Sequence, residues 1–212
     1  MNFKNIRTGV IGVGSMGQNH ARIYSEISDL VGVADPDEVQ GTKVAERFGV
    51  KWFKDYREMM ESVDAVSISV PTSLHLKIAS EIIDAGINLL VEKPLSDNIA
   101  DARKIVEMAN ESSVILAVGH VERHNPVISY AKSAIEKGDW GEIITLTSKR
   151  VSNFPERITD VGVLFDLCIH DIDISNYLSS SKVKSVYALG GNKISTHEDH
   201  INLCLSYESG IV

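Results

Sequence analysis

The chain has 212 residues, of which 43% are hydrophobic and 24% are charged, and its formal net charge at pH 7 is −8. These values are typical of a globular chain long enough to bury a substantial core, and they exclude collagen, a coiled coil and general disorder. An acidic surface repels phosphate backbones, so we expect no nucleic-acid partner.

The two cysteines, Cys168 and Cys204, lie far apart and indicate neither a disulfide framework nor a zinc cage. Their number is typical of a protein in a reducing compartment. The first residues lack the apolar stretch of a signal peptide, and no apolar run approaches the ~18 residues of a membrane span. We therefore expect a cytoplasmic protein with no membrane partner.

Short apolar runs alternate with amphipathic stretches over the first part of the chain. Strands are expected at 6–13, 30–34, 64–70, 87–91 and 114–118, and helices at 15–28, 39–48, 56–61, 74–85 and 99–112. This alternation predicts parallel βαβ units with helices on both faces of the sheet. The expected fold class is α/β, beginning with a doubly wound parallel sheet.

The pattern changes near residue 120. Helices are expected at 124–137 and 163–178, and strands at 141–151, 183–189 and 200–207. We therefore expect two domains, 1–120 and 121–212, the second of α+β type with an open sheet. Ile211 and Val212 follow a turn and would begin a return strand, so this second domain is expected to be incomplete.

A glycine motif, Gly12-x-Gly14-x-x-Gly17, lies between the first strand and the first helix. Such glycines allow a tight turn, a close approach of a pyrophosphate and close packing of helix on strand. Asp35 ends the second strand 18 residues after Gly17, where a carboxylate accepts hydrogen bonds from a ribose and repels a 2′-phosphate. The motif predicts NAD rather than NADP as the cofactor. The alternative is a turn without a ligand, with Asp35 capping the next helix.

Two segments follow other predicted strands and should border the same crevice. In Glu92-Lys93-Pro94, the lysine is placed to orient a hydroxyl or polarise a carbonyl, although a solvated turn lysine is an equal alternative. The sequence leaves open whether the bond before Pro94 is cis or trans. In 71–75, Thr72 or Ser73 is expected to cap the following helix.

Asp166 and His170 are four residues apart in a predicted helix and share one face, with Asp173 a turn beyond. A histidine beside a carboxylate suits proton transfer from a hydroxyl, and the alternative is a surface ion pair. His197-Glu198-Asp199-His200 also gathers potential metal ligands, but it lies at the entry to a strand and we expect no metal there.

Taken in chain order, these motifs resemble the Gfo/Idh/MocA oxidoreductase family. The resemblance implies a Rossmann domain followed by an α+β domain whose open sheet often forms a dimer interface, and hence a homo-oligomer. It implies a catalytic group of Lys93, Asp166 and His170, with His170 as the general base. The cofactor contacts that we expect are Gly12, Gly14, Ser15, Met16, Gly17, Asp35, Pro71, Thr72, His75, Glu92 and Lys93.

Two further stretches, 119–126 and 150–157, resemble a branch of the family that oxidises the 3-hydroxyl of UDP-N-acetyl sugars to a 3-keto group. A forked guanidinium suits a diphosphate or a carboxylate, although ordinary surface charge is the alternative. The substrate-binding residues that we expect are Arg123, Asn125, Arg150, Arg157 and Asp173.

The resulting hypothesis is an NAD-dependent oxidoreductase that transfers a hydride between nicotinamide and a sugar hydroxyl carbon, C3 of a UDP-N-acetyl sugar. One alternative is a dehydrogenase of another polyol, free sugar or imine. The other is a truncated NAD-binding protein without catalysis, because members of the family extend well beyond residue 212.

Overall fold

The computed structural model describes residues 3–153 and 161–212. The chain forms two compact units, Met1–Gly119 and His120–Val212, which we call unit 1 and unit 2.

Unit 1 is built on six parallel strands. They are β1 (Phe3–Ile11), β2 (Ser28–Ala34), β3 (Lys51–Phe53), β4 (Ala65–Ile68), β5 (Asn88–Val91) and β6 (Leu116–Val118). Their order across the sheet is β3-β2-β1-β4-β5-β6, and all neighbouring pairs are parallel. The direction of winding reverses between β1 and β4, and such a point opens a ligand crevice at the carboxyl ends of the strands. The predicted doubly wound sheet is confirmed, with β3 as an added strand.

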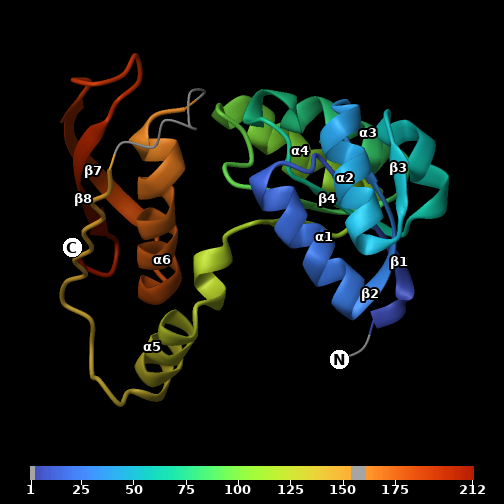
Figure 1. Ribbon diagram of the computed structural model, residues 1–212. Coiled ribbons are helices and arrows are strands. Elements are labelled where there is room, and N and C mark those ends of the chain that lie inside the picture. The colour runs from blue at the N-terminus through green and yellow to red at the C-terminus, as the bar shows by residue number, and fades with distance from the viewer. Residues whose placement is uncertain (1–2, 154–160) are drawn as a thin grey trace. The chain divides into compact units, whose positions relative to one another are not determined.

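Helices cover both faces of this sheet. They are α1 (Ser15–Ile27), α2 (Glu38–Phe48), α3 (His75–Asp84) and α4 (Ile99–Ser112), with the short 3-10 helices η1 (Tyr56–Ser62) and η2 (Thr72–Leu74). Figure 1 shows α1 and α2 on one face and α3 and α4 on the other. Side-chain caps mark the starts of α2 and α4. The side chain of Asp37 accepts from backbone N–H groups of α2, Asn98 does the same for α4, and Gly49 ends α2 with a φ of 67°. The expected cap of α3 by Thr72 or Ser73 is wrong, because these residues form η2 and Leu74 precedes α3 without a side-chain cap.

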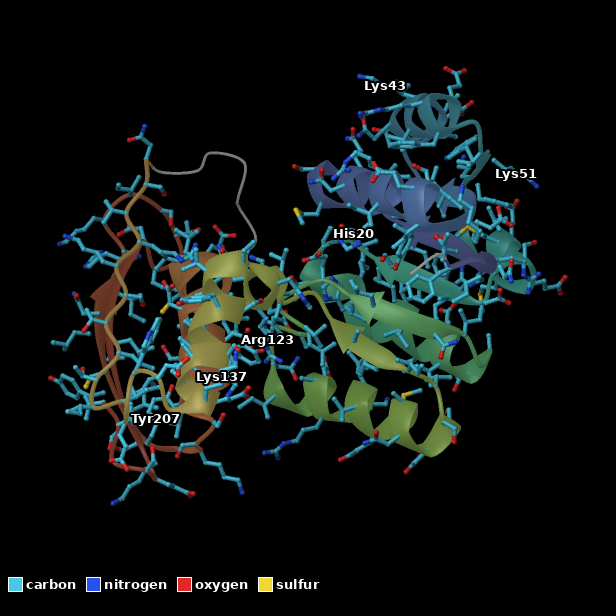
Figure 2. The ribbon with its side chains drawn as sticks, turned by 90° about the horizontal axis from the view of Figure 1, so that it is seen from below. His20, Lys43, Lys51, Arg123, Lys137 and Tyr207 are labelled. Atoms are coloured by element: carbon cyan, nitrogen blue, oxygen red, sulfur yellow. The ribbon has the colours of Figure 1, made fainter. Side chains whose placement is uncertain are left out.

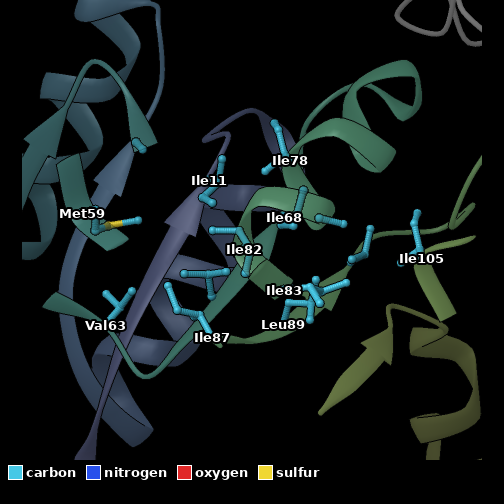
Figure 3. Packing of buried hydrophobic residues seen from close by; sticks show 14 of the residues in the cluster. Ile11, Met59, Val63, Ile68, Ile78, Ile82, Ile83, Ile87, Leu89 and Ile105 are labelled. Atoms are coloured by element: carbon cyan, nitrogen blue, oxygen red, sulfur yellow. The ribbon is translucent and has the colours of Figure 1, made fainter. Parts of the chain in front are cut away.

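Each face of the sheet has its own apolar core. The larger core packs α3, α4 and η1 on the strands and centres on Ile68, Ile82 and Ile83 (Figure 3). The smaller core, under α1 and α2, includes Val10 and Val33. Burial on both faces explains why the strands of this unit are continuous apolar runs.

Unit 2 combines helices with one hairpin. Its helices are η3 (Val121–His124), α5 (Pro126–Lys137), the π-helical turn η4 (Leu164–Cys168) and α6 (Ile169–Ser179). The hairpin pairs β7 (Val183–Gly191) with β8 (His200–Tyr207) in antiparallel register. After β8, Gly210 turns the chain with a φ of 90°, and the N–H of Tyr207 donates to the carbonyl of Ile211.

The strand expected at 141–151 is wrong. Residues 141–153 carry no strand assignment, and apart from the turn bond of Gly141 to Gly138 the backbone bonds found for this segment join Ile144 and Leu146 to Val212. A strand needs a continuous series of backbone hydrogen bonds to a neighbouring strand, and here the segment bonds to one residue, Val212. The side chains of Ile144 and Val151 are therefore 81% exposed.

Within the described part of the chain, every helix is too short or too polar to cross a membrane.

The core of unit 1 can be tested at Ile82, which is fully buried. We expect Ile82→Ala to lower the free energy of unfolding by about 2–5 kcal/mol, because it removes buried methyl groups and leaves a cavity. The measurement is denaturant unfolding followed by circular dichroism. The matched control is Ile115→Ala, where the side chain is 72% exposed and the expected change is within about 0.5 kcal/mol. Equal losses in the two variants would contradict this packing.

Candidate cofactor-binding and active site

The glycine loop between β1 and α1 depends on missing side chains. Gly12 has a φ of +82°, and a Cβ there would lie 2.5 Å from the carbonyl oxygen of Ser69. A Cβ on Gly17 would lie 1.9 Å from the carbonyl oxygen of Gly12, so only glycine lets α1 pack this closely on the loop. Above Gly14 nothing lies within 4 Å. The loop is therefore held rigidly on one side and open on the other.

Asp35 lies beside this loop at the end of β2. Its Oδ2 accepts a hydrogen bond from the N–H of Val13 at 2.8 Å, and its Oδ1 accepts one from the N–H of Asp37 at 2.9 Å. A carboxylate retains further lone pairs after these two bonds. It is thus held where it can accept from a ribose hydroxyl and repel a 2′-phosphate.

The first turn of α1 has the features of a phosphate site. Gly14 supplies no side-chain cap, and no acidic residue lies in the first turn. The N–H groups at this end carry partial positive charge and attract anions. Ser15 and Met16 are exposed beside them. Together with the open face of Gly14 and the position of Asp35, this end of the helix fits a dinucleotide such as NAD.

Lys93 is the second residue after β5, and its side chain is half-buried. The Lys93–Pro94 bond is cis, which settles a point that the sequence left open. Pro71 and Thr72 follow β4 at the same edge of the sheet and begin η2. The strands bring the glycine loop, Asp35, Pro71 and Lys93 to one edge because all six run in the same direction.

Two expected cofactor contacts have other partners. His75 is 1% exposed, and its ring nitrogens lie 3.0 Å from the carbonyl oxygens of Val70 and Pro94. Glu92 is 9% exposed and lies 2.8 Å from Nε2 of His20. Both side chains are thus occupied inside unit 1, and we now expect them to shape the turns rather than to touch a cofactor.

In unit 2, Asp166 lies in η4 and His170 lies in the first turn of α6. The N–H of Ile169 donates to the carbonyl of Leu164, the i to i+5 bond of a π turn. The sequence predicted an uninterrupted helix here. Single π turns inside helices are frequent at functional sites, and this one separates the expected catalytic aspartate from the expected catalytic histidine.

The start of this helix is anchored by Glu198. Its carbonyl oxygen accepts from the N–H of Val163 at 2.8 Å, and its Oε1 accepts from the N–H of Leu164 at 3.2 Å. The neighbouring Asp199 accepts from the N–H groups of Lys193 and Ile194 and from the His200 ring, and these bonds hold the pKa of its carboxyl well below the usual range. The acidic residues of 197–200 thus shape a turn and a helix start.

The expected substrate-binding residues of unit 2 that the structure describes have partners inside unit 2. Arg123 makes a two-pronged pair with the 7% exposed Asp173, at 2.8 and 2.5 Å. Arg150 lies 3.0 Å from Asp171 and 3.4 Å from Glu122. Asn125 caps α5 by accepting from the N–H of Val127. Arg157 lies outside the described residues.

These ion pairs change the expectation for the arginines. A guanidinium that already faces a carboxylate has less positive charge to offer to a diphosphate. The bond to Asp173 also raises the pKa of Arg123, which stays charged. We now expect Arg123 and Arg150 to hold α6 against the segment 120–125 and against the extended chain at 150.

His20 is not among the residues predicted from the sequence. His20 is labelled in Figure 2. Its ring nitrogens lie 3.0 Å from Oγ of Ser67 and 2.8 Å from Oε1 of Glu92. A signal was present, because His20 lies on the same helical face as Gly17, Ala21 and Tyr24, the face that packs on the sheet. A polar residue on a buried face needs partners, and these are supplied by β4 and by the turn after β5.

The strand order, the glycine loop and Asp35 define unit 1 as a Rossmann domain of the dinucleotide-binding class. Family comparison agrees. Residues 6–120 match the model described as the oxidoreductase family with an NAD-binding Rossmann fold, and residues 128–212 match the Gfo/Idh/MocA C-terminal domain. The chain belongs to the Gfo/Idh/MocA family of oxidoreductases.

Individual relatives are similar over most of the chain. UDP-N-acetylglucosamine 3-dehydrogenase of Acidithiobacillus ferrooxidans is 34% identical over 98% of this chain and 65% of its own length. A solved structure of that protein superposes with a TM-score of 0.90, at 33% identity, over 97% of this chain and 67% of its own. Myo-inositol 2-dehydrogenase of Thermotoga maritima is 32% identical over 87% of this chain and 58% of its own length. The chain thus spans about two thirds or less of these relatives.

A further solved structure is GenD2 from gentamicin A biosynthesis, in complex with NAD. It superposes with a TM-score of 0.87 at 26% identity, over all of this chain and 64% of its own.

The role of Asp35 can be tested by titration calorimetry with NAD and NADP. We expect Asp35→Ser to weaken NAD binding about tenfold, because a charge-assisted hydrogen bond is lost, and to improve binding of NADP. Asp37→Ser is the matched control, since serine also caps a helix. An unchanged preference for NAD in Asp35→Ser would contradict the assignment.

The Arg123–Asp173 pair can be tested by unfolding. We expect Arg123→Ala to cost roughly 1–2 kcal/mol, because a buried carboxylate loses its partner while the guanidinium side is partly exposed. Arg22→Ala removes the exposed pair with Glu26 and should cost at most about 0.5 kcal/mol. If Arg123→Ala is as stable as the native chain, the pair is not structural and a substrate role regains support.

Proposed function

We propose that this chain forms the cofactor-binding and catalytic part of an NAD-dependent dehydrogenase that oxidises a secondary hydroxyl of a sugar or polyol. The observation that carries the proposal is the dinucleotide site of unit 1, with its glycine loop, Asp35 and Lys93 at one edge of the sheet. Lys93 lies at the carboxyl edge of the sheet. In unit 2, Asp166 lies in the π-helical turn η4 and His170 lies in the first turn of α6. The match of both units to one oxidoreductase family supports it.

Lys93, Asp166 and His170 each have a separate role in such an oxidation. Lys93 donates a hydrogen bond to the hydroxyl oxygen and stabilises negative charge that develops there. His170 accepts the hydroxyl proton as general base, since imidazole changes its charge near neutral pH. Asp166, four residues earlier, holds the ring in orientation. When bound, NAD supplies the acceptor for the hydride that leaves the same carbon.

For the substrate, we propose a UDP-N-acetyl sugar oxidised at C3. The similarity to the Acidithiobacillus ferrooxidans UDP-N-acetylglucosamine 3-dehydrogenase, which extends over 98% of the chain, supports this choice. The proposal does not depend on the arginines of unit 2, because Arg123 and Arg150 already have carboxylate partners.

A polyol such as an inositol is the second candidate. Its support is the 32% identity to the myo-inositol 2-dehydrogenase of Thermotoga maritima. A cyclitol presents a similar secondary hydroxyl but no diphosphate, so a requirement for the UDP group separates the two candidates.

Two further proposals concern the setting of the protein. We propose a homo-oligomer formed through the sheet of unit 2, supported by the exposed Val186, Tyr187 and Leu189 of β7. The cytoplasm remains our predicted compartment.

The proposed activity can be tested by following NADH formation with UDP-N-acetylglucosamine, free N-acetylglucosamine and myo-inositol. We expect turnover with the UDP sugar alone. His170→Ala should lower kcat about a hundredfold or more while NAD affinity stays unchanged, because only the proton acceptor is removed.

The control is His197→Ala, an exposed histidine elsewhere in unit 2, which should keep full turnover. Full turnover in His170→Ala would refute the assigned base. Turnover with myo-inositol but not with the UDP sugar would favour the second candidate.

A further inference from the structure

A chain of polar side chains runs through the interior of unit 1 from α1 to the turn that carries Lys93. Oγ of Ser67, which is fully buried, lies 2.7 Å from the hydroxyl of Tyr24 and 3.0 Å from Nδ1 of His20. Nε2 of His20 lies 2.8 Å from Oε1 of Glu92. The second oxygen of Glu92 accepts from the N–H of Lys93 at 3.2 Å. We call these five residues the His20 chain.

The residues of this chain come from three separate elements. Tyr24 and His20 lie on α1, the helix that follows the glycine loop, and Ser67 lies on β4. Glu92 and Lys93 follow β5. The His20 chain therefore connects the cofactor helix to the proposed catalytic lysine without passing through solvent.

The space around Glu92 leaves the carboxylate little freedom. A Cβ on Gly119 would lie 2.9 Å from its Oε1. Burial acts to raise the pKa of Glu92, but the hydrogen bond and charge of His20, with the N–H and charge of Lys93, outweigh burial and lower the pKa. Glu92 is thus an anion at neutral pH, and a buried anion needs these donors.

Hydrogen-bond directions give His20 a specific task. An ionised carboxylate only accepts hydrogen bonds. Nε2 of His20 must therefore carry a hydrogen atom and donate a hydrogen bond to Glu92. On the other side of the ring, the hydroxyl of Ser67 donates to Tyr24, and its oxygen lies 3.0 Å from Nδ1. The carboxylate of Glu92 is thus held by the ring.

The opposite side of the same turn is held by a second buried histidine. His75 on α3 contacts the carbonyl of Pro94 at 3.0 Å. The residues before and after Lys93 are thus fixed from two helices on opposite faces of the sheet. Lys93 itself is left half-buried between them.

We propose that His20 is a positioning residue for Lys93, acting through Glu92, so that the cofactor helix and the lysine that meets the hydroxyl are aligned by one buried hydrogen-bond chain. The inference rests on the proposed function, in which Lys93 contacts the reacting hydroxyl. The ring nitrogens of His20 are engaged by Ser67 and Glu92, so His20 acts through Glu92 and not on the hydroxyl itself.

The kinetic test uses the 212-residue chain and two conservative variants, His20→Gln and Glu92→Gln. Both keep side-chain volume and a polar group. We expect kcat to fall about ten- to a hundredfold, because a small misplacement of a catalytic group is costly, with little change in KM or in the Kd for NAD. The control is Arg22→Gln, an exposed position on the same helix, which should keep native kinetics.

A second measurement needs no turnover. Acylation of lysines by an amine-reactive ester, quantified by peptide mass spectrometry, reports the surroundings of Lys93 against those of Lys77, an exposed lysine of α3. We expect His20→Gln and Glu92→Gln to change the labelling of Lys93 relative to Lys77, and Arg22→Gln to leave the ratio unchanged.

The outcomes separate the two proposals. If the native chain turns over no substrate but the Lys93 labelling ratio changes in both variants, the proposed function fails and the coupling of His20 to Lys93 stands. An unchanged ratio with unchanged kcat overturns the coupling. The third outcome is a lower melting temperature in both variants, with a parallel loss of NAD binding and of the difference in labelling between Lys93 and Lys77. This outcome assigns His20 a merely structural role and overturns the coupling as well.

Discussion

The close approach of α1 to the loop after β1 is the constraint on which unit 1 depends. Gly17 leaves no room for a Cβ against the carbonyl of Gly12, and Gly12 itself adopts a φ of +82°. This contact sets the height and rotation of α1 on the sheet. It thereby points the N–H groups of the helix toward the open face of Gly14 and, one turn further, places His20 against Ser67 and Glu92. The cofactor site and the turn that carries Lys93 therefore depend on the same contact between α1 and the loop after β1.

Unit 2 is held together differently from unit 1. Its helix α6 is fixed by charges: Arg123 on Asp173, Arg150 on Asp171, and Glu198 at the first turn. Unit 1 instead relies on apolar burial on both faces and on buried neutral or paired groups. Exposed ion pairs contribute little to stability, whereas leaving a buried carboxylate such as Asp173 without its arginine is costly. The Arg123–Asp173 pair also fixes direction, because a two-pronged arginine–carboxylate pair permits few orientations.

The relatives match both units but extend beyond this chain, and the proposed chemistry needs residues from each unit. Lys93 belongs to the sheet of unit 1, whereas Asp166 and His170 belong to the helices of unit 2. The chain is similar both to a nucleotide-sugar dehydrogenase and to an inositol dehydrogenase, so the shared fold does not by itself name a substrate.

The sequence by itself determined the alternating strands and helices of unit 1, the glycine loop and Asp35, because local signals such as periodicity, caps and fixed spacings carry them. The tertiary structure alone decided three things. The side chains of His75 and Glu92 are buried inside unit 1, and Arg123 is paired with Asp173. Residues 141–153 form no strand ladder. Each depends on residues distant in sequence, and a side chain's partner across such a distance is set by packing, which no local pattern encodes.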